Sequence, residues 1–359
     1  MAFPRTLWLL SGVFGLSTAL GCGGAPSSGP VNAEVGQGPT NTPDEATVPA
    51  IEVAGPEGPS SPDRSVSAPQ RDGAAGKEAA ARPKGLLGRA DAEQYVLKIV
   101  NRDRAAQGLP PVRWDPTAAK AGQRHANDMA KLGFTGHTGS DASVPETRYT
   151  DAGGQGLVME NAGCFGDATA RELDPDPRFT PESLERVQKQ FMDEVPPADG
   201  HRRNILMPRH TAFGVGLAKV KGIDEVACMA QEFVDDYGRY DPLPARAKIG
   251  DTIRIAGEVR APATFAGVGL SRVDPGKPRT PKELLAMGGY PIPAPYATYF
   301  PRGFKTPKPV EVTGNRFEIQ LPLDDKGRAG RYGVSVWATF PGSKELVMIS
   351  LRTITVEKK

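Results

Sequence analysis

The sequence predicts an α+β protein in which a module of helices and strands precedes a smaller all-β module. Two stretches within residues 91–132 carry apolar residues at three- and four-residue spacing, the pattern of amphipathic helices. Residues 213–220 and 226–234 have the composition of strands, and the lysine-glycine turn between them predicts an antiparallel pair. After residue 242, short alternating runs between glycine- and proline-containing turns indicate a β-sandwich.

Size and charge restrict the class of protein. The chain has 359 residues, which exceeds one typical domain and predicts two domains with additional segments. It carries 44 Lys and Arg residues against 42 Asp and Glu residues, and this near-balance argues against nucleic acid as the main partner. Hydrophobic residues make up 38% of the chain although a polar N-terminal stretch dilutes that figure, so the remainder can build real cores.

The N-terminus has the pattern of an export signal. Arg5 supplies a positive charge, and the apolar run from Leu7 to Leu20 is too short for a comfortable membrane span. The sequence Ala-Leu-Gly-Cys that ends at Cys22 resembles a bacterial lipobox, in which the cysteine becomes the lipid-carrying N-terminus. We predict a lipoprotein-type signal peptide at residues 1–21 and lipidation of Cys22. The alternative is an ordinary signal peptide with an incidental cysteine.

Residues 22–88 are rich in Pro, Gly, Ala and Ser and contain almost no aromatic residues. Such a segment cannot bury enough apolar surface to offset its chain entropy, so we predict a disordered tether. At roughly 5–6 Å × √n, its ends would lie about 45 Å apart on average. Gly23 stands where an aspartate retains lipoproteins in the inner membrane of some bacteria, which favours the outer membrane as the site of anchoring.

Two helices are predicted at the start of the first module, which we assign to residues 89–241. The first begins near Asp91 and ends near Gly108, before a pair of prolines. The second begins with Asp115 as N-cap and a proline at the first helical position. His125 lies on its apolar stripe, and we interpret it as a buried, hydrogen-bonded histidine, with a ligand role as the alternative.

Four side chains carry the chemistry of the predicted site. His137 follows the second helix in a loop of small residues, and Glu160 lies among apolar neighbours that predict a half-buried carboxylate in need of a partner. Glu194 ends a helix that begins at Thr180, and His201 follows at a turn. Two imidazoles and two carboxylates suit a divalent metal or acid–base chemistry, so we expect them to converge in one cleft. For Glu160, simple pairing with an arginine is the alternative.

The chain contains three cysteines. If Cys22 is acylated, Cys164 and Cys228 remain as an even pair in an oxidising compartment, and we expect a disulfide between them. The alternative is that Cys164 is a thiol nucleophile, which competes poorly because an exported free thiol oxidises readily.

The second module, residues 242–359, offers no comparable cluster of ligand-type residues. Its stretch from Tyr290 to Pro309 is rich in prolines and aromatic residues and is predicted to be a long surface loop. We expect about five strands. Whether this module only spaces the chain or binds a partner stays open at this point.

Residues from about 90 to 240 resemble the CAP superfamily, also called SCP or PR-1-like domains. Each matching segment is short, but their shared order over about 150 residues carries the resemblance, which does not extend to the second module. The matching segments are Val100–Arg104, Leu109–Asp115, His125–Ala130, Phe134–His137, Glu160–Ala162, Gly200–Leu206 and Phe213–Gly216.

The resemblance implies an α-β-α sandwich with a large cleft that holds two histidines and two glutamates. By motif position His137, Glu160 and His201 match three of them, and Glu194 is the candidate for the fourth from its place late in a helix. In several family members the cleft binds zinc or another divalent cation. Some eukaryotic members bind sterols, fatty acids or phospholipids.

Further residues of the matching motifs are expected to support the site, namely Asn161, Arg202 and Asn204. The chain also departs from the bacterial family pattern. Residues 167–180 add an acidic, proline-bearing stretch that we expect to narrow or cover the cleft. The two cysteines differ from the multi-cysteine pattern of eukaryotic members.

The sequence therefore favours an envelope-anchored binding module for a lipid, another small molecule or a divalent metal. No catalytic residue is assigned, because the chain has no His-Glu-x-x-His run, no Gly-x-Ser-x-Gly elbow and no Cys/His nucleophile motif. One alternative is a zinc-dependent hydrolase of peptides or cell-wall material, with Glu160 or Glu194 as base. Another is a tetrad that only stabilises the fold.

Overall fold

The computed structural model describes residues 84–359, except residues 224, 226–227 and 288. The predicted signal peptide, the predicted lipidation site Cys22 and most of the predicted tether lie outside the described residues. Among the helices of the described part, none combines the length and the apolar character that a membrane crossing requires.

The first module is built around a four-stranded sheet with the strand order β1-β3-β4-β2. β1 runs parallel to β3, whereas β3 pairs antiparallel with β4, and β4 with β2. The predicted antiparallel hairpin is therefore confirmed as the pair β3–β4. The strands are β1 Arg113–Trp114, β2 Leu157–Gly163, β3 Ala212–Ala218 and β4 Cys228–Asp235.

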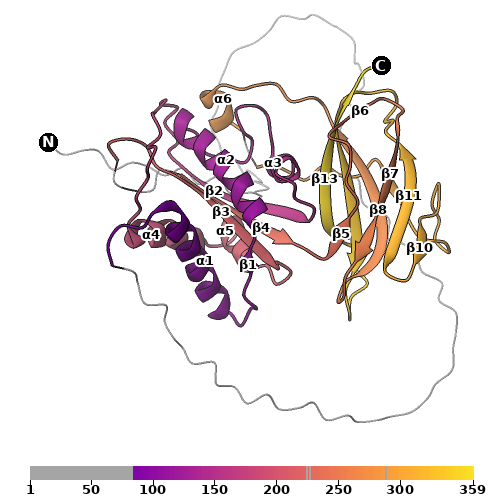
Figure 1. Cartoon of the computed structure of the whole chain (residues 1–359), viewed down its shortest axis with the longest axis horizontal. Helices are drawn as coiled ribbons and strands as arrows, with labels where there is room; N and C mark the ends of the chain where they lie inside the picture. Colours follow the sequence, from indigo (N-terminus) through magenta and orange to yellow (C-terminus); the bar gives the residue numbers. More distant parts are fainter. Residues whose placement is uncertain (1–83, 224, 226–227, 288) are drawn as a thin grey trace, which may run out of the picture. The chain divides into compact units, whose positions relative to one another are not determined.

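Helices cover both faces of this sheet, so the predicted α-β-α sandwich is confirmed (Figure 1). On one face, Phe213 and Val215 of β3 belong to a core that includes residues of α1 and α4. On the other face, Gly214 and Gly216 meet α2 so closely that a Cβ atom at Gly216 would lie 2.1 Å from the backbone of Gly122. The helices are α1 Arg89–Ala105, α2 Pro116–Leu132, α3 Pro145–Asp151, α4 Pro181–Met192 and α5 Gly200–Ile205.

Local signals in the sequence set the ends of these helices. The Asp115 side chain caps α2 by accepting hydrogen bonds from the backbone N–H groups of Thr117 at 2.8 Å and Ala118 at 3.1 Å. α2 ends at Gly133, whose φ of 71° lies in the left-handed region that favours glycine. Thr180 caps α4 in the same manner. These ends agree with the predicted ones because each signal acts within one turn of chain.

The predicted disulfide between Cys164 and Cys228 is confirmed. It joins the end of β2 to the start of β4, where the two strands are neighbours in the sheet. The cysteines are 64 residues apart in the sequence, a loop for which chain entropy predicts a stabilisation of about 4 kcal/mol.

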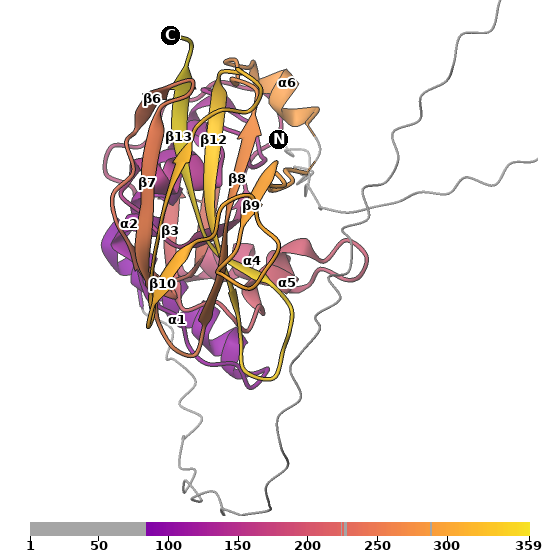
Figure 2. The ribbon, with the colours of Figure 1, turned by 90° about the vertical axis from the view of Figure 1, so that its right-hand side faces the viewer.

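The second module is a β-sandwich, as predicted, and the described residues contribute nine strands to its two sheets (Figure 2). One sheet has the order β10-β11-β7-β5 and the other β6-β13-β12-β8-β9. β5 belongs to this sandwich because it pairs with β7, although it precedes the predicted module boundary at residue 242. The position of that boundary stays a prediction. The strands are β5 Gly238–Tyr240, β6 Arg246–Lys248, β7 Thr252–Val259, β8 Thr264–Val273, β9 Ala297–Tyr299, β10 Glu311–Thr313, β11 Arg316–Pro322, β12 Gly330–Thr339 and β13 Val347–Glu357.

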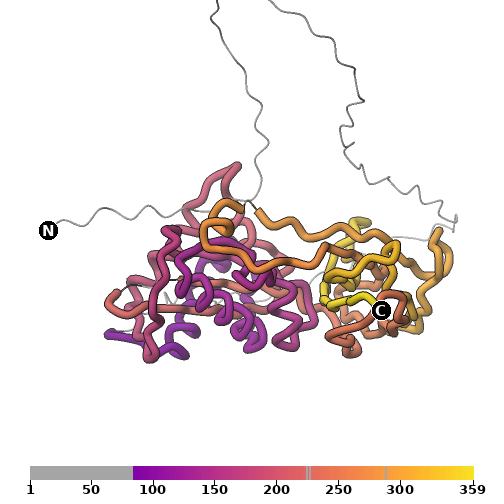
Figure 3. Tube along the Cα trace, turned by 90° about the horizontal axis from the view of Figure 1, so that it is seen from above, coloured from indigo at the N-terminus to yellow at the C-terminus, as the bar shows by residue number. Residues whose placement is uncertain are grey.

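Residues 274–296, here called the strap, connect β8 to β9 by way of the first module (Figure 3). The strap contains the short helix α6 (Pro281–Leu285), which places Leu284 in the hydrophobic core beside α2. The chain then returns to pair β9 with β8. The prediction of a surface loop over residues 290–309 was therefore wrong in part: β9 lies within it, and Tyr290 contacts the first module.

Candidate functional site

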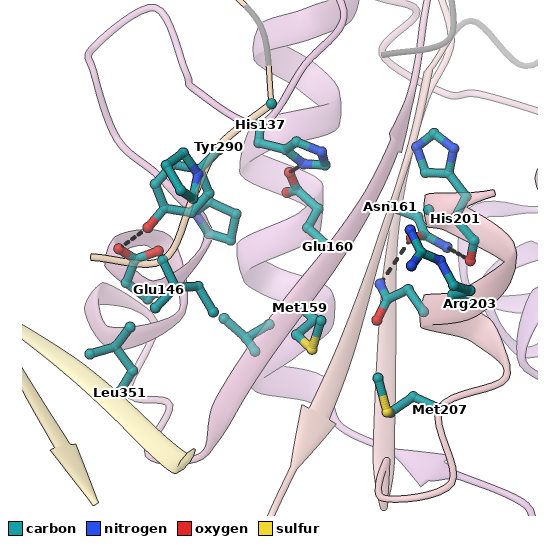
Figure 4. Close-up of a pocket in the computed structure, with 17 residues that line it drawn as sticks. His137, Glu146, Met159, Glu160, Asn161, His201, Arg203, Met207, Tyr290 and Leu351 are labelled. Atoms are coloured by element: carbon teal, nitrogen blue, oxygen red, sulfur yellow. Dashed lines mark hydrogen bonds and ion pairs between the residues drawn. The ribbon is translucent and has the colours of Figure 1, made fainter. Parts of the chain in front are cut away.

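A pocket of about 750 Å³ lies at β2, the edge strand of the first module's sheet (Figure 4). Its walls come from β2, α3 and α5, from the strap and from β13. The lining residues are His137, Pro145, Glu146, Val158, Met159, Glu160, Asn161, Gly200, His201, Arg203, Asn204, Met207, Gly289, Tyr290, Pro291, Ile292 and Leu351.

The alternation of β2 presents different residues on the two faces of the sheet. Glu160 points toward the layer of α2 and α3, where it meets His137 from the loop between these helices. Asn161 points toward the layer of α5, where it meets the backbone carbonyl of His201. The two histidines therefore reach the edge strand from opposite helical layers, as Figure 4 shows.

Glu160 is the charged centre of the first half of the site. One carboxylate oxygen accepts a hydrogen bond from Arg148 Nη2 at 2.7 Å, and the other lies 3.0 Å from His137 Nδ1. Burial by itself would raise the pKa of Glu160, but the neighbouring Arg148, His125 and His137 outweigh it and hold the pKa well below its usual range. Glu160 thus pairs with an arginine, the alternative that the sequence left open, and also contacts a pocket histidine, while its role in a metal or acid–base site stays a prediction.

His125 has the buried, hydrogen-bonded role that the sequence favoured. It is 1% exposed, and its Nε2 lies 2.7 Å from the carbonyl oxygen of Gly136. Burial and, after it, the positive charge of Arg148 together lower the pKa of His125 to about 4, so the ring is neutral near pH 7. Its contact with Gly136 helps to fix the loop that carries His137.

His201 and Glu194 form the second half of the site. The His201 ring places Nδ1 2.5 Å from one oxygen of Glu194, and the His201 backbone N–H donates to the other at 2.9 Å. The ring also packs against Phe191, with ring centroids 4.6 Å apart. Arg202 donates to the backbone carbonyl of Met192 at 2.7 Å, which ties α5 to the end of α4.

The structure thus arranges the four predicted residues as two pairs, His137 with Glu160 and His201 with Glu194. Three of them line the pocket, and Glu194 contacts His201 from outside the lining. Within the described residues, no three or more His, Cys, Asp or Glu side chains are grouped so that they could hold one metal ion. This arrangement does not fit a preformed zinc site, and metal binding stays a prediction.

Sequence reasoning missed the contribution of the second module to this pocket. The strap supplies Tyr290 and Ile292, and β13 supplies Leu351. The Tyr290 hydroxyl donates a hydrogen bond to Glu146 of α3, and burial raises the pKa of both groups. The proline- and aromatic-rich composition of the strap's second half was the only local signal of this role.

The acidic stretch at residues 167–180 does not narrow the pocket. None of its residues belongs to the lining; Ala168 bonds to the backbone of Gly133, and Asp174 to that of Lys219. The prediction that this stretch covers the cleft was wrong, because it packs along the end of α2 and the end of β3.

Glu232 is a second carboxyl group behind Glu160, and no role was predicted for it from the sequence. The two residues are direct partners in the β2–β4 register, and Glu232 is fully buried. Neither of its oxygens has a donor among the described residues. Burial and the charge of Glu160 raise the pKa of Glu232 well above its usual value, so Glu232 holds a proton where Glu160 does not.

The three-layer α-β-α fold and the histidine–glutamate pairs at the sheet edge agree with what the resemblance to CAP domains implies. Residues 97–231 match the CAP family model, described as the cysteine-rich secretory protein family. The chain therefore contains a CAP domain, as its motifs predicted.

Three similar proteins each match less than half of this chain. The chain is 30% identical over 124 residues to the uncharacterized protein YkwD of Bacillus subtilis, a match that covers 34% of this chain and 41% of that protein. An extracellular SCP-domain protein from Bacillus anthracis is 19% identical with a TM-score of 0.31, covering 43% of this chain and 45% of that one. An outer surface protein from Borrelia burgdorferi is 15% identical with a TM-score of 0.31, and the match covers 42% of this chain and 96% of that one.

Proposed function

We propose that this protein is an exported, lipid-anchored binding protein whose CAP-domain pocket takes a small molecule with an apolar body. The observation that carries the proposal is the composition of the pocket walls. Val158, Met159, Met207, Ile292 and Leu351 offer apolar surface, and a few polar groups lie among them. A concave site with mostly apolar walls and a small number of placed polar groups is the usual form of a small-molecule site.

The N-terminal sequence supports the placement in the cell envelope. A charged start, a short apolar run and Cys22 precede the polar tether, an order that suits export followed by lipid attachment. Metabolic labelling with a palmitate analogue tests the anchor. We expect label on the wild-type protein and none on Cys22→Ala; label that survives this substitution would remove the anchor from the proposal.

Native mass spectrometry of the exported chain, after incubation with an envelope extract, tests the pocket. We expect a bound small molecule on the wild type and its loss in Met159→Trp, where the larger side chain fills the pocket. Val195→Trp is the matched control, because Val195 is 69% exposed and outside the pocket lining. Thermal unfolding of all three proteins checks that they are folded. A wild type without any bound molecule contradicts the proposal.

Divalent-ion binding is the second candidate function. Each pocket histidine has its Nδ1 held by a glutamate, which is the way that proteins orient histidines whose Nε2 binds a metal. Calorimetric titration with zinc should then show binding that is lost in the double variant His137→Ala, His201→Ala. An absence of heat in both proteins would remove this candidate, and with it the zinc-dependent hydrolase.

A further inference from the structure

A chain of side-chain hydrogen bonds runs through the first module beneath the pocket. It begins at Asp103 of α1 and ends at Asp235 of β4. Its members, in order, are Asp103, Gln188, Gln231, Asn161, Asn204, His210 and Asp235. Two of them, Asn161 and Asn204, also line the pocket. The direction of each bond decides what these two amides present to a ligand.

The Asp103 end fixes the first directions. An ionised carboxylate only accepts hydrogen bonds, and Arg102 lies 2.9 Å from this one. Gln188 must therefore donate to Asp103 through Nε2, at 2.8 Å. Its oxygen is then left to accept from Gln231 Nε2 at 2.7 Å, and the oxygen of Gln231 accepts from Asn161 Nδ2 at 3.2 Å.

A backbone carbonyl gives the same orientation independently. Asn161 Nδ2 lies 3.2 Å from the carbonyl oxygen of His201, which can only accept. The oxygen of Asn161 therefore accepts from Asn204 Nδ2 at 2.9 Å. The oxygen of Asn204 then faces His210 Nε2 at 2.9 Å, so this ring nitrogen has to donate.

At the other end, His210 Nδ1 lies 2.7 Å from Asp235 Oδ1, and both side chains are fully buried. The second oxygen of Asp235 is 3.5 Å from Arg209 Nε, and the buried Arg104 donates to the carbonyls of Ile205 and Met207 nearby. Asp235 thus has two arginine side chains among its neighbours. A chain of amides with a carboxylate at each end needs one member that donates in both directions.

We propose that His210 is that member: a positioning residue whose two ring nitrogens donate to Asp235 and to Asn204, which orients Asn204 so that the pocket presents an N–H donor. One hydrogen of Asn204 Nδ2 is used by Asn161, and the other has no hydrogen-bond acceptor among the described residues, so it remains for a ligand. Arg203, with its guanidinium partly exposed, lines the same end of the pocket. This inference rests on the proposed function and names the ligand class: an apolar body with an oxygen acceptor as its head, such as a carboxylate.

The protonation of His210 is tested without any ligand, by ¹⁵N NMR of the histidine rings in the full chain. The chain has four histidines, so His210 is assigned by loss of its signal in His210→Asn, or by elimination with Gln variants of the other three. At about pH 7 we expect a hydrogen on both ring nitrogens of His210, because each faces a hydrogen-bond acceptor. Asp235→Asn should remove the second hydrogen. One bare ring nitrogen at that pH in the wild type overturns the assignment.

The head group is tested with two probes that have the same ten-carbon alkyl chain. One probe carries a carboxylate as its head group, and the other carries an amine. We expect the carboxylate to bind the wild type at least about tenfold more tightly, and His210→Gln to lose this preference. Arg302→Gln, in the second module and far from the chain of bonds, should keep it. Equal or tighter binding of the amine overturns the ligand class. If neither probe binds the wild type, the ligand class fails, while native mass spectrometry judges the proposed function and the NMR result judges His210 separately.

Discussion

Glu160 and Glu232 show how two adjacent carboxyl groups acquire opposite protonation states. Glu160 has Arg148 and His137 as partners, and its pKa falls although it is buried. Glu232 has no donor among the described residues, and burial next to a charged neighbour raises its pKa. The proton on Glu232 allows it to donate to Glu160, so the pair carries one negative charge, which matches the one charge of Arg148.

Replacing Glu232 with glutamine should stabilise the protein near pH 7. The folded state binds the Glu232 proton more tightly than the unfolded state, whose pKa is near 4.5. Stability is therefore lost as the pH rises above that value toward the folded pKa. Glutamine keeps a donor toward Glu160 and has no proton to lose. We expect Glu232→Gln to gain roughly 1–3 kcal/mol at pH 7 and to show a flatter profile above pH 4.5.

Urea unfolding at several pH values between about 4.5 and 8 measures this effect. Glu172→Gln is the matched control, because Glu172 is exposed and pairs with Lys221 at the surface. The prediction is contradicted if Glu232→Gln is less stable than the wild type and the free energy of unfolding of both proteins depends on pH in the same way. Glu232 would then be ionised in the folded state.

Sequence reasoning identified the pocket histidines and Glu160 because they stand in short motifs. It did not identify Arg148 or Glu232 as their partners. Arg148 reaches Glu160 only because α3 lies against β2. Glu232 is a neighbour of Glu160 only because the β2–β4 register places these two residues opposite each other. Such partners depend on how distant segments pack, which no local pattern encodes. The polar residue Tyr290 was missed for the same reason.

At the scale of elements, local signals were sufficient wherever a few neighbouring residues decide the structure. The starts of α2 and α4 and the antiparallel pair β3–β4 are of this kind. The number of strands in the second module was underestimated, because several are only three residues long and exist through pairing with a longer neighbour. The path of the strap was not predictable, since its contacts lie in the other module.

The N-cap of α2 gives a prediction at this scale. Asp115 accepts two backbone hydrogen bonds through one oxygen and the Tyr149 hydroxyl at 3.0 Å through the other. Asp115→Ala removes all three, and we expect the free energy of unfolding to fall by about 1–3 kcal/mol. Asp115→Asn keeps an oxygen for the cap and should lose clearly less. Equal losses in the two variants, measured by urea unfolding, would show that the cap is not the source of the effect.

At the scale of the whole described chain, the two modules share hydrogen bonds and a pocket. Gln155 donates to the carbonyl of Tyr240 at 2.9 Å, and Ser350 donates to the carbonyl of Gln155 at 2.5 Å. The strap adds a further connection through α6. The second module therefore does more than space the chain, because it supplies part of the wall of the candidate binding site.

The contact between Tyr290 and Glu146 should couple the strap to the CAP domain energetically. Glu146 is 3% exposed, so Tyr290→Phe leaves a buried carboxyl group without this donor while the ring stays in place. We expect Tyr290→Phe to lose roughly 1–3 kcal/mol of stability, and Glu146→Gln to reduce that loss when the two are combined. Tyr296→Phe is the matched control, since Tyr296 lies in the same strap and packs its ring against Tyr332. Additive single losses in the double-mutant cycle would mean that the hydroxyl does not hold the strap. In that case the strap residues would line the pocket through packing alone, and the affinity for a pocket ligand should be the same in wild type and Tyr290→Phe.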